Sequence, residues 1–177
     1  MTTATSNIDF RKLRPSDRAA VLELHADPAG TDGYFRFFGP PPKNLDRVVG
    51  SIASNDRTHC AVGAFIDDDL IGVANFVVLD DGVSAEIAMV VAAAGEQHHG
   101  IGTDLLYRLA ALGRARGLDR FIAEVVPTNS KAMRLIIDSY LPISAHRSDG
   151  VIQIAFHLRN SEPSSASRRH RAARANT

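Results

Sequence analysis

The chain has 177 residues, of which 45% are hydrophobic, and equal numbers of acidic and basic side chains leave it without net charge. These values are typical of one globular domain, while a single cysteine excludes an internal disulfide and a zinc site built from four cysteines. No basic segment followed by an apolar run opens the sequence, and no apolar stretch is long enough to span a bilayer. We therefore expect a cytoplasmic protein that does not contact membranes.

The charge is distributed unevenly along the chain. Residues 160–177 carry four arginines against one glutamate and have almost no large apolar side chains. This composition predicts a disordered basic tail over 159–177, next to a folded domain over 8–158 and a flexible N-terminus over 1–7. Because the folded part is left mildly acidic, nucleic acid is not an expected partner.

Hydrophobic periodicity predicts the elements of the first half of the chain. In order, they are a strand at 8–14, a helix from Pro15 that ends before Asp27, a second helix at 43–54, and hairpin strands at 58–67 and 70–79. Between the two helices, four aromatic residues lie within 34–38, just before three prolines. This stretch fits either a short helix or an aromatic loop.

The second half of the chain alternates strands and helices. The pattern predicts strands at 84–92, 119–126, 143–147 and 150–158, and helices at 101–116 and 130–140, the latter capped by Thr128 or Asn129. The short crossover between strands 84–92 and 119–126 implies that these two are parallel, whereas the meander before them is antiparallel. The expected fold is therefore a single α/β (α+β) domain with a mixed central sheet and helices on its faces.

A glycine turn precedes helix 101–116 in the stretch GEQHHGIGTDLL, residues 95–106. The dinucleotide-binding fingerprint requires a third glycine where this chain has Leu105. The P-loop requires lysine and then serine or threonine directly after its second glycine, whereas Gly100 is followed by Ile101 and Gly102. Both templates fail. A third template, Gln/Arg-x-x-Gly-x-Gly/Ala, fits residues 97–102 at every position.

The physical chemistry of that turn favours a phosphate ligand. The first amides of a helix have no partner inside the helix, and the helix dipole makes this end positive. Two glycines leave room for a pyrophosphate to approach the backbone. The residues expected to bind a phosphate-bearing cofactor here are Gln97, His98, His99, Gly100, Ile101 and Gly102. We interpret the two histidines as loop residues beside the phosphate, because adjacent histidines rarely bind one metal, and we expect no metal site.

Residues 85–136, from AEIAMVV to AMRLI, resemble the acetyl-CoA-binding region of GCN5-related N-acetyltransferases (GNAT), and the order of elements over 8–158 fits that fold. The segments AEIAMVV, FIAEVVPTN and AMRLIIDSY, together with YFRFFG, are similar to the catalytic domain of bacterial protein-lysine acetyltransferases that modify acyl-CoA synthetases. The resemblance implies direct transfer of an acetyl group from acetyl-CoA to an amine such as a protein lysine. A small amine, such as an aminoglycoside or a polyamine, and a non-catalytic acyl-CoA-binding module are the alternatives.

The resemblance also implies roles for individual residues. Glu86 would be the general base, and burial within its apolar strand would raise its pKa toward a useful value. Glu124 is its rival, since it holds a similar position on the neighbouring strand and could instead orient the substrate or pair with an arginine. The main-chain amides of Met89, Val90 and Val91 would hold the thioester oxygen.

Asn129 matches the family asparagine that reaches the pantetheine arm, although it could equally serve only as a helix cap. The chain departs from the family where a tyrosine often protonates the leaving thiolate, because this position is Ile136. Tyr140, one helical turn further on, is a possible substitute. The sequence gives no indication of the acceptor, the acyl-chain preference or the oligomeric state.

Overall fold

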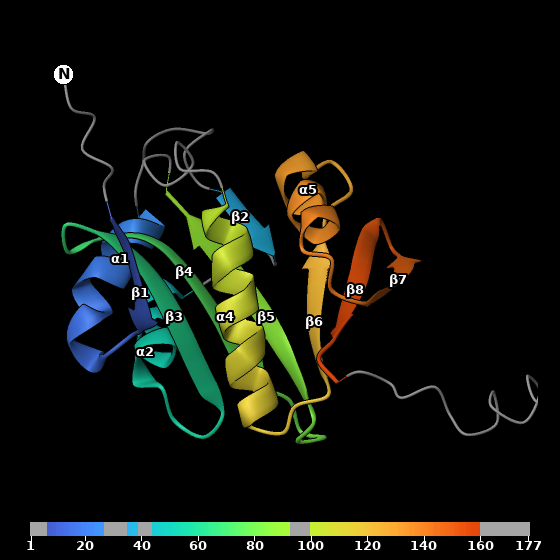
Figure 1. Cartoon of the computed structure of the whole chain (residues 1–177), viewed down its shortest axis with the longest axis horizontal. Helices are drawn as coiled ribbons and strands as arrows, with labels where there is room; N and C mark the ends of the chain where they lie inside the picture. Colours follow the sequence, from blue (N-terminus) through green and yellow to red (C-terminus); the bar gives the residue numbers. More distant parts are fainter. Residues whose placement is uncertain (1–6, 27–34, 39–43, 93–99, 160–177) are drawn as a thin grey trace, which may run out of the picture.

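The computed structural model describes residues 7–26, 35–38, 44–92 and 100–159. Within these residues, eight strands form one sheet (Figure 1). The strands are β1 (Ile8–Lys12), β2 (Phe35–Phe38), β3 (His59–Ile66), β4 (Asp69–Val78), β5 (Ser84–Val91), β6 (Arg120–Val125), β7 (Ile143–Ser148) and β8 (Val151–His157). The helices are α1 (Arg18–Ala26), which follows a 3-10 turn at Pro15–Asp17, α2 (Leu45–Ser54), α4 (Ile101–Ala115) and α5 (Ser130–Asp138).

The sheet is mixed, as the sequence predicts. Its order is β1-β3-β4-β5-β6-β8-β7, and β2 pairs with β5 outside this path. β5 and β6 are parallel, whereas every other pair of neighbouring strands is antiparallel among the described elements. The predicted parallel strand–helix–strand unit is therefore confirmed as β5–α4–β6.

Helices cover both faces of the sheet (Figure 1). On one face, α1 and α2 pack on β3 and β4 through a core that includes Val21, Val49 and Val73. On the other face, α4 and α5 pack on the middle of the sheet. The rings of Phe76 and Phe121 lie in this second core with their centroids 5.4 Å apart. Burying these apolar faces from water is the main driving force that holds the helices on the sheet.

The apolar face predicted for α4 is the face that the helix buries. Ile101, Leu105 and Leu109 are buried, and Leu112 is partly buried against the same core. Gly113 lies one turn after Leu109 and faces Phe121 of β6 and Leu158. A Cβ atom placed on Gly113 would lie 2.8 Å from Cζ of Phe121 and 2.9 Å from Cδ1 of Leu158, so glycine sets the distance between α4 and the sheet.

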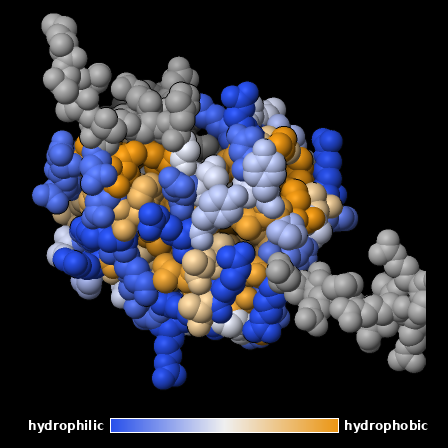
Figure 2. Space-filling model, in the orientation of Figure 1, coloured by the Kyte–Doolittle hydropathy of each residue, from blue (hydrophilic) through white to orange (hydrophobic). Residues whose placement is uncertain are grey.

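The far end of the sheet is less covered than its middle. Hydrophobic side chains reach the surface around α5 and β8 (Figure 2). Ile137 of α5 is 69% exposed and Ile143 of β7 is 43% exposed. Every residue of β7 is exposed, which is compatible with its position at the edge of the sheet.

Most predicted boundaries agree with the structure within two residues, and the exception is informative. Residues 35–38 form strand β2, so the prediction of a short helix or an aromatic loop for this stretch is wrong. The pairing of β2 with β5 is a contact between segments distant in the sequence, and local patterns do not report such contacts. Asn129, and not Thr128, caps α5.

Two of the predicted segments lie mostly beyond the described part of the chain. These are the N-terminal segment 1–7, of which only Asn7 is described, and the basic tail, of which only Arg159 is described. No helix within the described residues is long and apolar enough to cross a membrane.

Two helical glycines provide a matched test of this packing. Gly113→Ala should lower the free energy of unfolding by about 1–2 kcal/mol, because overpacking against Phe121 exceeds the gain in helix propensity. Gly50→Ala in α2 should raise it by about 0.5–1 kcal/mol, since a Cβ atom there meets nothing within 4 Å. Urea denaturation followed by circular dichroism measures both. Equal stabilisation by the two variants would contradict the close approach of α4 to β6.

Candidate functional site

The site forms where β5 and β6 separate. The two parallel strands pair only over Ser84–Glu86 and Arg120–Ile122. Beyond this point β6 continues beside β8 and β5 continues beside β4, so the two strands leave a gap in the sheet. In open sheets with parallel strands, ligands bind outside the carboxyl ends of the strands, and this gap lies at that end of β5 and β6.

Helix α4 begins at the same end of the sheet. Its N-cap residue, Gly100, has a φ angle of +91°, a left-handed conformation that favours glycine. The carbonyl of Gly100 accepts the first helical hydrogen bond from the amide of Asp104, so the amides between them are not bonded within the helix. A Cβ atom on Gly100 would meet nothing within 4 Å. A pyrophosphate group fits the chemistry of amides that lack a partner within the helix.

The two glycines of the turn have different surroundings. Gly102 lies against α5 and β5, and a Cβ atom there would be 3.2 Å from Cδ1 of Leu135 and 3.5 Å from Sδ of Met89. Gly102 therefore holds the start of α4 against its neighbours, whereas Gly100 faces open space. The other predicted cofactor residues of this turn, Gln97, His98 and His99, lie outside the described residues.

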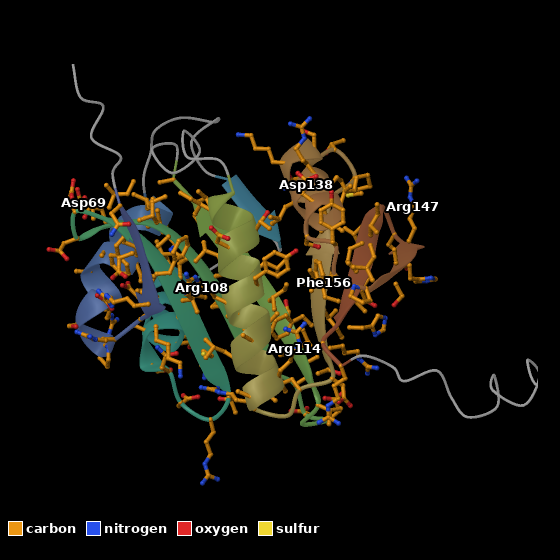
Figure 3. The ribbon with its side chains drawn as sticks, in the orientation of Figure 1. Asp69, Arg108, Arg114, Asp138, Arg147 and Phe156 are labelled. Carbon is orange, nitrogen blue, oxygen red and sulfur yellow. The ribbon has the colours of Figure 1, made fainter. Side chains whose placement is uncertain are left out.

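Two arginines of α4 are engaged in holding the helix on the sheet. Arg108 projects toward β1 (Figure 3), where its guanidinium lies 4.5 Å from the centre of the Phe10 ring. Arg114 projects from the other side of α4, and its Nε donates a hydrogen bond of 2.6 Å to the carbonyl of Leu158. Neither points to the start of the helix. At that end the helix contributes its amides and its dipole to anion binding.

Of the residues predicted to hold the thioester oxygen, Met89 and Val91 direct their amides to the edge of β5 that borders the gap. The amide of Val90 points to β4, as that of Ala92 does, so the prediction is wrong for Val90. Met89, Val90 and Val91 have buried side chains. Their backbone pairs with β4 on one edge and with β2 on the other. In Figure 1, β2 lies between the upper ends of β5 and β6. Sequence reasoning missed β2 as a neighbour of these amides.

Glu86 lies at the last residue pair before the strands separate. It is exposed, so the burial that we predicted for it is wrong. Alternate residues of a strand point to opposite faces, and Ala85 and Ile87 point into the core beneath α4, which leaves Glu86 on the other face of the sheet. Local sequence showed only an apolar run, whereas exposure depends on which face the helices leave uncovered.

Strands β6, β8 and β7 present polar side chains on that same face. Glu86 is opposite Ile122, which is opposite Ala155 of β8, and residues directly opposite each other share a face. Two residues further along β6, Glu124 is opposite Gln153 of β8, which is opposite His146 of β7. The two glutamates thus lie on one face, on the two sides of the gap.

A shallow cavity extends this polar face. It has a volume of about 320 Å³ and is lined by Arg120, Ile122, Ser144, Ala145, His146, Gln153, Ala155 and His157. Sequence analysis could not find this group, because its members come from three strands and meet only through cross-strand pairing.

Asn129 and the two candidate positions for an acid lie on or next to α5. Asn129 caps the helix, and its Oδ1 accepts a hydrogen bond of 3.1 Å from the amide of Ala132. Ile136 is buried. Tyr140 lies beyond the opposite end of the helix, with a φ angle of +52° and a side chain that is 88% exposed. The position of Tyr140 does not favour a role beside the pantetheine arm that Asn129 is expected to contact.

Thiol chemistry finds little support in the described residues. Burial raises the pKa of the Cys60 thiol, so the single cysteine of the chain is a poor nucleophile. Across residues 7–26, 44–92 and 100–159, no group of three or more His, Cys, Asp or Glu side chains could hold a metal ion.

The comparisons agree with this geometry. A model of the acetyltransferase (GNAT) family matches residues 19–136. No curated protein matches the chain in sequence. Among solved structures, the GNAT domain of S. lividans PAT shares 24% identity and has a TM-score of 0.68, over 84% of this chain and 89% of that one.

Two further solved structures extend this similarity. The yncA protein of Salmonella typhimurium, solved with its cofactor acetyl-CoA, shares 19% identity and has a TM-score of 0.68, over 88% of this chain and 96% of that one. A spermidine N-acetyltransferase from Vibrio cholerae, in complex with CoA and spermine, shares 17% identity and has a TM-score of 0.62, over 87% and 97%. With the family model spanning more than half of its length, the chain belongs to the acetyltransferase (GNAT) family and is an N-acetyltransferase.

Proposed function

We propose that the chain transfers the acetyl group of acetyl-CoA directly to the side-chain amine of a protein lysine, with Glu86 as the general base. The arrangement around the gap between β5 and β6 carries this proposal. The first amides of α4 lie at the carboxyl end of the gap, on the face that α4 covers. Glu86 lies at the opposite end of the gap, on the uncovered face. Donor and acceptor can therefore enter from different faces and meet between the strands.

The residues of the chain divide the chemistry between them. When bound, acetyl-CoA supplies a thioester whose carbonyl carbon is open to attack by an amine. The amides at the start of α4 would bind the pyrophosphate, and those of Met89 and Val91 would donate to the thioester oxygen as charge develops on it. Asn129 would contact the pantetheine arm.

Proton transfer at the acceptor is the task of Glu86. A lysine amine has a pKa of about 10.4 and is mostly protonated at neutral pH, so it must lose a proton before it can attack. The exposed carboxylate of Glu86 can accept that proton directly or through a water molecule. The carbon–nitrogen bond then forms as the carbon–sulfur bond breaks. A thiol has a pKa of about 8.5, so the thiolate can leave without a dedicated acid, which is consistent with Ile136 in place of a tyrosine.

The shape of the acceptor side favours a protein lysine, such as a lysine of an acyl-CoA synthetase, over a small amine. Sites for small molecules are usually concave and bury most of their ligand. The face around Glu86 is instead open, with a shallow cavity over β6, β8 and β7. A long side chain projecting from a protein surface can reach Glu86 across such a face.

A second cavity of about 510 Å³ does not compete for this role. It is lined in part by Glu23, Asp68 and Asp69, whose charges suit a cation. It also contacts Ala92, which is six residues beyond Glu86 along the strand, or about 20 Å away at the rise of a β-strand. An amine bound beside Ala92 therefore has no contact with the proposed base along this strand.

The conservative change Glu86→Gln tests the base directly. It should lower kcat by about 10²–10³-fold while leaving the Kd for acetyl-CoA unchanged, because only proton transfer is removed. Coenzyme A release, measured with purified acyl-CoA synthetases and with small amines as acceptors, gives kcat, and calorimetry gives Kd. Unchanged turnover would overturn the assignment of Glu86.

The matched variant Glu124→Gln, on the same face, separates the two glutamates. It should raise the KM for the acceptor more than it lowers kcat, because Glu124 would orient a cation and not accept its proton. The reverse result would exchange the two roles. Binding of acetyl-CoA without turnover of any acceptor would favour the non-catalytic module.

Asn129 can be tested for a role beyond its helix cap. Asn129→Asp keeps the oxygen that accepts from Ala132, so it should retain thermal stability, whereas Asn129→Ala should lose about 1 kcal/mol. If the side-chain amide also donates to the pantetheine arm, both variants should weaken acetyl-CoA binding by about tenfold, the value of one hydrogen bond. Calorimetric titration with acetyl-CoA measures this, and an unchanged Kd for Asn129→Asp would leave the cap as the sole role.

A further inference from the structure

Strand β2 lies where the proposed function requires acetyl-CoA. β4 pairs with β5 along one edge, from Ala85 to Val91. The other edge is shared, since β6 pairs with it over Ser84–Glu86 and β2 pairs with it over Met89–Val91. β2 also lies against β6 and α5, on the two sides where the gap would otherwise be open.

Backbone pairing and cofactor binding would compete for the same groups. Successive residues of a strand present their backbone groups to opposite edges, so Met89 and Val91 face β2, whereas Val90 faces β4. A thioester oxygen held by amides on the β2 side needs donors that β2 already engages. The pantetheine arm carries amides of its own and could replace β2 by pairing with β5 as an added strand does.

Several features of β2 suit a strand that can be displaced. It has four residues, and its register with β5 shifts between Arg36 and Phe38, so the ladder is short and irregular. Irregular pairing of this kind is common beside active sites. β2 is also antiparallel to β5 and pairs with it alone, unlike β3 and β4, which are held on both edges.

We propose that β2 is a self-inhibitory strand, which closes the gap between β5 and β6 in the free protein and leaves it when acetyl-CoA binds. This inference rests on the proposed function, because it assigns the amides of Met89 and Val91 to the cofactor. The fraction of molecules with β2 displaced then limits the apparent affinity for acetyl-CoA. Any partner that draws β2 away would activate the enzyme without touching its catalytic residues.

Hydrogen exchange with and without coenzyme A tests the displacement. Amides of 35–38 should be protected in the free protein and should exchange faster when coenzyme A is saturating, while amides at the start of α4 become more protected. Calorimetry on the same sample establishes that coenzyme A binds. Protection of 35–38 that is unchanged or increased in the bound state would overturn the inference and leave the proposed function intact. Absence of binding would overturn both.

A reversible crosslink provides a second test. Arg36 and Val90 are opposite each other in the β2–β5 register, at a Cα separation of about 4.5–5.5 Å in antiparallel sheets, which a disulfide can span. The double variant Arg36→Cys/Val90→Cys should lose at least tenfold in affinity for coenzyme A when oxidised and recover on reduction. Arg36→Cys alone, treated with the same oxidant, controls for modification of the buried Cys60. Equal affinity in the oxidised and reduced double variant would overturn the inference.

Discussion

The parallel pairing of β5 with β6 over only three residues on each strand is the constraint on which the rest of the site depends. Parallel neighbours must be joined by a crossover, and here the crossover is α4, whose start must return near the end of β5. At the end where β5 and β6 pair, the ring of Phe76 in β4 contacts that of Phe121 in β6, and Gly113 lets α4 approach Phe121 closely. These contacts hold α4 and the strands together there. Beyond Glu86, β6 remains paired with β8 and no longer pairs with β5, and this divergence leaves the gap.

Under the proposed function, the gap gives the two reactants separate entrances. The α4 face supplies amides without a partner inside the helix and a helix dipole, which suit a polyanionic donor. The opposite face supplies carboxylates at Glu86 and Glu124, which suit a cationic acceptor. An exposed Glu86 is consistent with this division, because a base that serves a protein substrate must be reachable from solvent.

The sequence allowed the fold to be predicted because its signals are local. The apolar face of α4 at Ile101, Leu105 and Leu109 and the cap at Asn129 each follow from a few neighbouring residues. The predictions that failed depend on contacts between residues that are distant in the sequence. Whether Glu86 is buried depends on the coverage of a whole sheet face, and whether 35–38 forms a strand depends on a partner more than fifty residues away at Val90. The ladder from Glu124 through Gln153 to His146 likewise requires the strand order to be known.

The two glycines of the Gln/Arg-x-x-Gly-x-Gly/Ala template obey different physical rules, and this explains which residues the template permits. At Gly100 the backbone itself is left-handed, so any side chain is strained even though there is space for one. At Gly102 the backbone is an ordinary helix, and the limit is the Leu135 methyl group 3.2 Å from a new Cβ atom, which can yield by a few tenths of an ångström. Alanine is therefore tolerable at the second position and not at the first. A template usually interpreted as the requirement of one ligand therefore reflects two separate limits. One is the left-handed backbone at Gly100, and the other is the space available for a side chain at Gly102.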